Sequence, residues 1–160
     1  MNKKIKNALI SISDKTELSL IIGALKKHKI NIISSGGTYK SIKKMGFKCK
    51  EISQFTNFNE MLDGRVKTLH PKIHSGILFD RSKKKHVAQM KKKKFETIDL
   101  VIVNFYPFKE TLKKTKNKNL IIENIDIGGP SMVRAAAKNF KYVTIITDKK
   151  DYSELIKELK

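Results

Sequence analysis

The stretch from Asp63 to Pro71 concentrates chemically active side chains in a short segment. Its sequence, DGRVKTLHP, holds two cations and an imidazole together with one glycine and one proline. Gly64 permits backbone angles that other residues resist, and Pro71 holds its predecessor extended, so these side chains should lie on irregular backbone. Arg65 offers a planar fork for phosphate or carboxylate, and Lys67 offers a mobile charge. The pairing suits an anionic ligand; the alternative is a solvated basic loop in a lysine-rich chain.

A second candidate binding segment follows a β-branched run and contains two neighbouring glycines. It consists of Ser35, Gly36, Gly37 and Thr38. Its hydroxyl groups and uncovered backbone N–H groups stand at the start of a predicted helix, where the helix dipole favours anions. An earlier segment that can complete this phosphate cradle consists of Ser13, Asp14 and Lys15. The alternatives are an ordinary strand-to-helix turn and, for the earlier segment, a helix cap beside a surface lysine.

Polar residues later in the chain supply groups for acid–base chemistry. Asp126 precedes a predicted helix on which Arg134 and Lys138, four residues apart, share one face. Asp126 and Lys138 can act as an acid and base pair; the alternative is a helix-capping carboxylate beside solvated cations. Asn104 and Tyr106 end an apolar run, where an amide and a phenol can orient a planar polar ligand. The alternative for Tyr106 is a core tyrosine with one satisfied hydroxyl.

The composition indicates one soluble domain. The 160 residues fit a single domain, and no run approaches the roughly 20 apolar residues of a membrane span. The net charge is +20, but only three of the 35 basic residues are Arg and the Lys are spread along the chain. This spread favours a compositional bias over a dedicated nucleic-acid surface. The single cysteine, Cys49, fits a reducing compartment, so we expect the cytoplasm. The histidines lack carboxylate or cysteine neighbours at zinc-ligand spacing, which argues against a zinc site.

Alternating strand and helix patterns predict the scaffold for these residues. Short apolar runs predict strands at 7–13, 30–34, 47–52, 72–79, 99–105 and 142–147, with 99–105 at the sheet centre and 47–52 at an edge. Helical patterns lie around an apolar stripe at 18–25 and at 39–45, 81–94, 132–139 and 148–160, while the polar segment 111–119 predicts a loop. This order predicts an α/β domain with a mainly parallel sheet. Because ligands bind at the carboxyl ends of such strands, the polar clusters after the first, second and central strands should converge on one site.

Five motifs, taken together, resemble one known family. They are SISDKT at 11–16, SSGGTYK at 34–40, DGRVKTLHPKIHSGIL at 63–78, VNFYPF at 103–108 and DIGGPSMVRAAAKN at 126–139. In this order they resemble the IMP cyclohydrolase domain of the bifunctional purine-biosynthesis enzyme that also carries an AICAR formyltransferase domain. The resemblance implies a single-domain, Rossmann-like fold of three layers, similar to methylglyoxal synthase. It also implies closure of the FAICAR ring to give IMP, without a metal or organic cofactor.

The resemblance also implies roles for particular residues. Lys138 is implied as the proton donor and acceptor, with Lys67, Tyr106 and Asp126 around the reacting atoms. The implied nucleotide-binding residues are Ser13, Asp14, Lys15, Ser35, Gly36, Gly37, Thr38, Arg65, Val66, Lys67, Thr68, Val103, Asn104, Asp126 and Ile127. The reaction needs such groups, because a base must take a proton from a poorly nucleophilic carboxamide nitrogen and donors must hold the oxyanion that forms.

The family enzyme continues beyond this domain. Further helices lead into the larger formyltransferase domain, and the whole enzyme is expected to form a homodimer. We expect residues 1–160 to be the cyclohydrolase domain without those later parts, either as a fragment or as a stand-alone domain.

Three other functions fit parts of the sequence. A non-catalytic regulatory domain of the same fold would bind a nucleotide without needing Lys67, Asp126 and Lys138 together. Methylglyoxal synthase would need carboxylate bases beside a phosphate loop, and it leaves the RVKTLHP and VRAAAKN segments unexplained. A basic nucleic-acid binder would show a steep salt dependence of binding.

Overall fold

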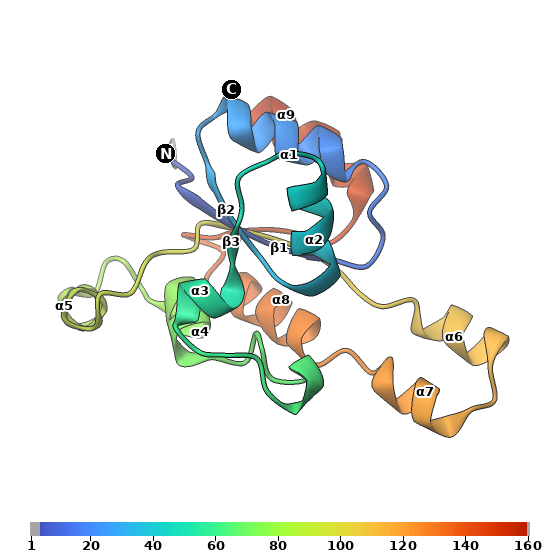
Figure 1. Ribbon diagram of the computed structural model, residues 1–160. Coiled ribbons are helices and arrows are strands. Elements are labelled where there is room, and N and C mark those ends of the chain that lie inside the picture. The colour runs from blue at the N-terminus through green and yellow to red at the C-terminus, as the bar shows by residue number, and fades with distance from the viewer. Residues whose placement is uncertain (1–3, 160) are drawn as a thin grey trace.

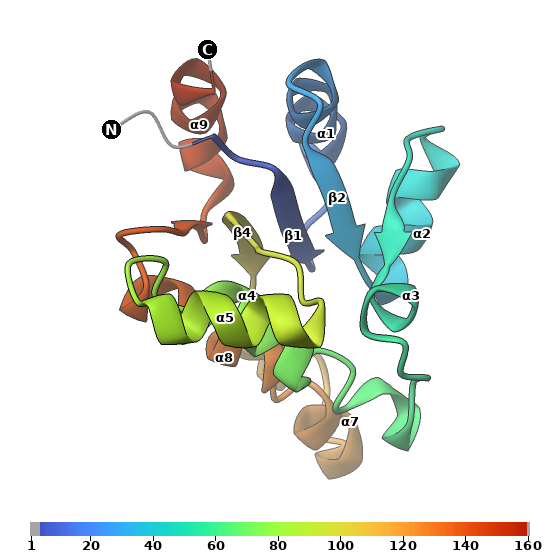
Figure 2. The same ribbon diagram turned by 90° about the vertical axis from the view of Figure 1, so that its left-hand side faces the viewer.

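The computed structural model describes residues 4–159, which fold around one parallel β-sheet (Figures 1 and 2). Its strands are β1 (Asn7–Ile12), β2 (Asn31–Ser34), β3 (Lys50–Glu51), β4 (Leu100–Asn104) and β5 (Thr144–Ile146). They lie in the order β3-β2-β1-β4-β5, and every neighbouring pair is parallel. The predicted α/β class and mainly parallel sheet are confirmed.

Helices cover both faces of the sheet and make three layers (Figures 1 and 2). One face carries α1 (Leu18–Lys27), α2 (Gly36–Lys44) and α9 (Tyr152–Glu158). The other carries α3 (Ile52–Thr56), α4 (Pro71–Leu78) and α8 (Gly128–Lys138). Strand β1 contributes Ala8, Ile10 and Ile12 to the first core and Leu9 to the second. Burial on both faces explains why this strand is mostly apolar in sequence.

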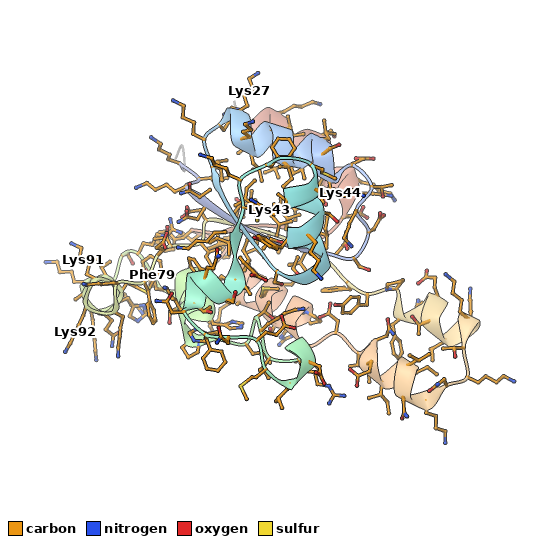
Figure 3. All side chains as sticks on the ribbon, in the orientation of Figure 1. Lys27, Lys43, Lys44, Phe79, Lys91 and Lys92 are labelled. Carbon is orange, nitrogen blue, oxygen red and sulfur yellow. The ribbon has the colours of Figure 1, made fainter. Side chains whose placement is uncertain are left out.

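Three further helices extend from this body. Figure 1 shows α6 (Phe108–Lys114) and α7 (Lys118–Glu123) as a pair that projects away from the sheet. The helix α5 (Lys84–Lys93) lies on another side, and its Lys91 and Lys92 extend outward in Figure 3, far from Lys27 on α1. The positive charge is therefore distributed over separate elements. No helix within residues 4–159 is long and apolar enough to cross a membrane.

A buried carboxylate fixes the amino end of the sheet. Asp99, which is 4% exposed, accepts hydrogen bonds from the backbone N–H groups of Lys6 (2.8 Å) and Asn7 (3.0 Å). The Arg81 guanidinium donates to its other oxygen (2.7 Å). Because a buried charge needs such partners, this contact holds β1 and β4 in register. That register brings Ile12 beside Asn104 at the opposite end of the two strands.

The segment 72–79, predicted as a strand, is the helix α4. Pro71 occupies the first helical turn, and the His70 imidazole accepts from the Lys72 N–H (3.1 Å), so the start of the helix is capped. Ile73 and Ile77, four residues apart, are fully buried on one helical face. The strand prediction was wrong because so short an apolar run does not separate helical from extended periodicity.

The predicted loop at 111–119 is also largely helical, since it overlaps α6 and α7. Neither helix buries a residue, so the sequence contains no core pattern that would indicate them. The strand predicted at or near the sheet centre, β4, is an interior strand one place from the middle, which β1 occupies. The edge strand predicted at 47–52 shrinks to the two residues of β3, and α2 begins at Gly36, earlier than predicted.

The last helical pattern divides into a short turn and a helix. The 3-10 turn η2 (Lys149–Asp151) precedes α9, and another, η1 (Leu62–Gly64), precedes the chemically dense loop. Leu62, Asp63 and Gly64 all have positive φ values, of 51°, 50° and 85°. Such left-handed residues are uncommon outside glycine, and here they form the turn that leads into the loop carrying Arg65 and Lys67.

Candidate active site

A cavity of about 490 Å³ lies at the carboxyl ends of β1, β2 and β4. The segments that follow these strands line it, together with the 63–68 loop and the residues before α8. The predicted site residues that line it are Ser13, Lys15, Ser35, Gly36, Gly37, Thr38, Arg65, Lys67, Thr68, Asn104, Tyr106, Asp126 and Ile127. The predicted convergence of separate polar segments is confirmed.

Two ammonium groups lie against the first turn of α2. A methyl group placed on Gly36 would lie 3.1 Å from Lys67 Nζ, and one on Gly37 would lie 3.7 Å from Lys15 Nζ. Gly64 approaches the same Lys67 ammonium, which would be 3.3 Å from a methyl group there. Because the start of a helix carries partial positive charge and free N–H groups, the two lysines add to a site for an anion. We define the anion cradle as the five residues Lys15, Gly36, Gly37, Gly64 and Lys67.

Buried hydroxyl groups brace the strand ends beneath the anion cradle. Thr38 Oγ1 donates to the Ile12 carbonyl (2.9 Å) and accepts from the Ile12 N–H (3.1 Å). Ser34 Oγ donates to the Ile10 carbonyl (2.7 Å). Thr38 is buried, and its single hydroxyl proton is used by β1. Thr38 therefore supports the cradle and has no proton left to offer a ligand.

The Asn104 amide binds the loop that follows β1. Its Oδ1 accepts from the backbone N–H groups of Ser13 (2.5 Å) and Asp14 (3.0 Å), and its Nδ2 donates to the Asp14 carbonyl (3.1 Å). The oxygen that was expected to orient a planar ligand thus has two protein donors already. The amide fixes the backbone from which Lys15 reaches the anion cradle.

The Asp14 side chain turns to the outside of the same loop and does not line the cavity. Its carboxylate accepts from the Thr16 hydroxyl, from the Thr16 N–H (2.9 Å) and from Lys149 Nζ (2.9 Å). These bonds, the one from the Thr16 hydroxyl first, hold the pKa of Asp14 well below its usual range. Asp14 therefore shapes the loop and does not face a ligand.

Asp126 lies where α8 begins. Its Oδ1 accepts from the Gly129 N–H (2.8 Å), as the helix-capping alternative predicts. A methyl group on Gly129 would lie 2.5 Å from Asp126 Oδ2, and one on Gly128 would collide with the Thr68 hydroxyl. The two glycines therefore allow the carboxylate and the hydroxyl to approach the first turn of α8. This brings an acidic group and a helix N-terminus to the same wall of the cavity.

Arg65 and Tyr106 line the more exposed part of the cavity. The Arg65 guanidinium pairs with the Glu123 carboxylate of α7, which raises the pKa of Arg65. Tyr106 follows β4 and is 47% exposed. Solvent or a ligand can reach both side chains.

His70 has a structural role in these contacts. Its Nδ1 accepts from the Lys72 N–H, and its ring lies 5.6 Å from the Phe58 ring. Burial, followed by the charge of Lys72, lowers the pKa of His70. Since it does not line the cavity, this imidazole caps α4.

The family of MGS-like domains matches residues 17–131 of the chain. The chain belongs to the MGS-like domain family. It is 53% identical over 157 residues to the bifunctional purine biosynthesis protein PurH of Acetivibrio thermocellus, and 50% identical over 155 residues to that of Clostridium perfringens strain SM101. These matches cover 98% and 97% of the chain but 30% and 31% of the PurH proteins.

A solved structure supports the same fold for this MGS-like domain. The structure described as "Crystal structure of ForH" matches with a TM-score of 0.84 and 29% sequence identity. The match covers 96% of this chain and 78% of that one. The predicted Rossmann-like, methylglyoxal-synthase-like fold is therefore confirmed.

Four predicted site residues do not line the cavity of this MGS-like domain: Asp14, Val66, Val103 and Lys138. Val103 is buried in the core beneath α8. Lys138 is the exposed last residue of α8, and a helix rise of 1.5 Å per residue places it about 15 Å from Gly128 along the axis. The expected pairing of Lys138 with Asp126 is not found in this chain, because the two residues flank opposite ends of one helix.

Sequence reasoning missed Glu123, which lines the cavity and binds Arg65. It lies in α7, next to the segment predicted as a loop, and no motif marks it. The only feature of the sequence that could have indicated Glu123 is its place three positions before Asp126, in a chain with few acidic residues.

Proposed function

We propose that this MGS-like domain carries IMP cyclohydrolase activity, the dehydrative closure of FAICAR to IMP. The observation that carries the proposal is one cavity that combines the anion cradle, which includes Lys67, with Tyr106 and Asp126. Similarity to proteins named for purine biosynthesis supports a purine nucleotide as the ligand. In a longer protein, this step would follow formyl transfer to AICAR.

The 5′-phosphate would lie at the first turn of α2. Lys15 and Lys67 would supply positive charge, and the N–H groups of Gly36 and Gly37 would donate hydrogen bonds. Arg65 has five N–H donors, so it can hold another polar group of the nucleotide while keeping its contact with Glu123.

The remaining cavity residues would serve the ring closure. The carboxamide nitrogen attacks the formyl carbon, an N–C bond forms, and the nitrogen gives its proton to a base. Asp126 would accept that proton, while Lys67 and Tyr106 would stabilise and protonate the formyl oxygen. Asp126 would then give its proton to the hydroxyl, which leaves as water. The neighbouring ring nitrogen would give its proton to the donor that protonated the formyl oxygen, Lys67 or Tyr106, as the C=N bond forms. Holding both groups of one molecule in contact supplies a further part of the rate.

Lys138 does not reach the cavity of its own chain, so its implied role requires a second copy. In the homodimer that the resemblance implies, α8 of another copy would bring Lys138 to this cavity. Lys138→Arg tests this, because a guanidinium keeps its proton near neutral pH. A loss of turnover of about 100-fold or more at unchanged IMP affinity would assign the proton transfer to Lys138 of a second copy. Unchanged turnover would assign it to Lys67, Tyr106 and Asp126.

A second candidate is a regulatory domain that binds the nucleotide without turnover. Two observations favour it: Lys138 lies outside the cavity, and one Asp126 oxygen already caps α8. Such a domain would bind IMP and leave FAICAR unchanged.

The deciding experiment follows FAICAR cyclisation by ultraviolet absorbance. We expect the wild type to form IMP and Lys67→Met to lose about 100-fold or more in rate, since it removes an oxyanion donor and a cradle cation. Lys44→Met is the matched control, because this exposed lysine at the far end of α2 does not line the cavity (Figure 3). IMP binding without turnover would favour the regulatory domain. A protein that shows no IMP binding and no turnover would refute both functions.

A further inference from the structure

The α6–α7 arm, which we define as residues 105–124, has little support from the rest of the molecule. No residue of α6 or α7 is buried, and the two helices pack mainly on each other. Large apolar side chains remain exposed along it, including Phe108, Leu112, Leu120 and Ile122. Helices of seven and six residues are too short to be stable alone in water. The arm therefore depends on whatever contacts tie it to the body.

Both ends of this arm lead into the cavity. Tyr106 lies at its start, and Asp126 and Ile127 follow its end; all three line the cavity. Figure 1 shows one end of the arm leaving β4, the other joining α8, and the two helices extending outward. The orientation of the arm therefore affects the position of the Tyr106 phenol, whereas the Asp126 carboxylate is also held by the Gly129 N–H of α8.

One polar side-chain contact ties the arm to the body. Within residues 4–159, the only ion pair or side-chain hydrogen bond between residues 105–124 and the rest of the protein joins Glu123 to Arg65. Arg65 belongs to the loop that follows the left-handed turn η1 and that carries Lys67 of the anion cradle. The pair thus crosses the cavity from one wall to the other. The other side-chain hydrogen bonds of the arm among the described residues lie within the arm itself.

We propose that Glu123 is a positioning residue: through Arg65 it fixes the α6–α7 arm, and with it Tyr106, at the cavity. The pair also holds the guanidinium in place, with further N–H donors free to face a ligand. The consequence of this positioning role for catalysis rests on the proposed function, whereas the effect of Glu123 on the arm does not.

The direct test is limited trypsin digestion of the ligand-free protein. The arm offers its own cleavage sites at Lys109, Lys113, Lys114, Lys116 and Lys118. We expect Glu123→Gln to speed cleavage in the arm about two- to fivefold, the range for loss of an exposed ion pair. Glu110→Gln is the matched control, because Glu110 is an exposed acid of α6 with no ion pair within the described residues. It should digest like the wild type.

Two further tests show whether the effect of Glu123→Gln comes from the lost ion pair or from altered packing: raising the ionic strength, and exchanging the two charges. Because salt screens exposed charges, raising the ionic strength should bring wild-type cleavage toward that of Glu123→Gln and leave the variant unchanged. The double variant Arg65→Glu/Glu123→Arg should restore slow cleavage at the native lysines of the arm, while either reversal alone should not. Mass spectrometry of the fragments separates these cuts from those at the new trypsin site that Glu123→Arg creates. If Glu123→Gln is cleaved at the same rate as the wild type at low salt, the proposal is overturned.

IMP titration of the same proteins separates this proposal from the proposed function. We expect Glu123→Gln to bind IMP about two- to fivefold more weakly than the wild type and Glu110→Gln to bind it equally well. If the wild type binds no IMP but the digestion results hold, the proposed function fails and the positioning role stands. If IMP binds and the arm digests identically in every variant, the positioning role fails and the proposed function stands.

Discussion

The two walls of the cavity are built in different ways. The anion cradle rests on buried groups, since Thr38 and Ser34 bond to β1 and Ile42 of α2 lies in the core. The opposite wall includes Tyr106 and Glu123 of the α6–α7 arm. Neither helix of this arm has a buried residue, and one exposed ion pair joins the arm to the body. The comparison shows that the core holds the anion cradle in place, whereas the placement of Tyr106 depends on an exposed contact that salt can weaken.

The largest expected effect is a difference in the free energy of unfolding between two alanine variants, one at an isoleucine of each wall. Ile42→Ala should lower the free energy of unfolding by about 2–5 kcal/mol, because it leaves a cavity at a fully buried position of α2. Ile122→Ala in α7, where the side chain is 53% exposed, should change it by less than about 0.5 kcal/mol. Urea denaturation of both variants measures the difference. A comparable loss for Ile122→Ala would show that the arm is packed against something and would end the comparison.

A smaller effect is expected from a pair of threonines. Thr38→Val should cost about 2–4 kcal/mol, because the N–H and the carbonyl of Ile12 both lose a buried partner. Thr111→Val removes a hydroxyl that donates to the exposed Pro107 carbonyl (3.2 Å), so it should be nearly neutral. Thermal unfolding followed by circular dichroism gives both values. Equal midpoints for Thr38→Val and the wild type would refute the bracing role of the buried hydroxyl.

The smallest effect concerns the titration of Asp14 on the cradle side. Bonds from Thr16 and Lys149 lower its pKa in the folded state, so its contribution to stability is present above the unfolded pKa of about 3.9 and is lost as pH falls through the folded pKa. Carboxyl chemical shifts should show Asp14 titrating below that value, and Lys149→Met should move the midpoint upward. A midpoint at or above 3.9 in the wild type would mean that the loop is not held in this way.

Much of the fold could be predicted because the core elements carry local patterns. The apolar stripe of α1 and the runs that form β1, β2 and β4 reflect burial, and burial is visible in single segments. The α6–α7 arm has no buried face and therefore no such pattern. The full order of the strands could not be predicted, because it depends on pairing between distant segments, such as Leu9 with Val101.

The candidate site was predictable in its location and less so in its detail. Polar segments after strands must meet at one edge of a parallel sheet, so the convergence followed from topology. Whether a side chain faces a ligand depends on partners far away in sequence: Thr38 bonds to Ile12, Asn104 to Ser13, and Asp14 to Lys149. Lys138 shows the same limit, because motif membership placed it at a site that the length of α8 keeps it from reaching in this chain.

The measurement that tests the central claim most directly is isothermal titration with IMP and with inosine, which differ only in the 5′-phosphate. The anion cradle predicts that IMP binds about 100-fold or more tightly, because two ammonium groups each add a charge-assisted hydrogen bond. Lys15→Met should remove a large part of this difference, while Lys44→Met should leave it unchanged. Equal affinities of the wild type for IMP and inosine would contradict the account.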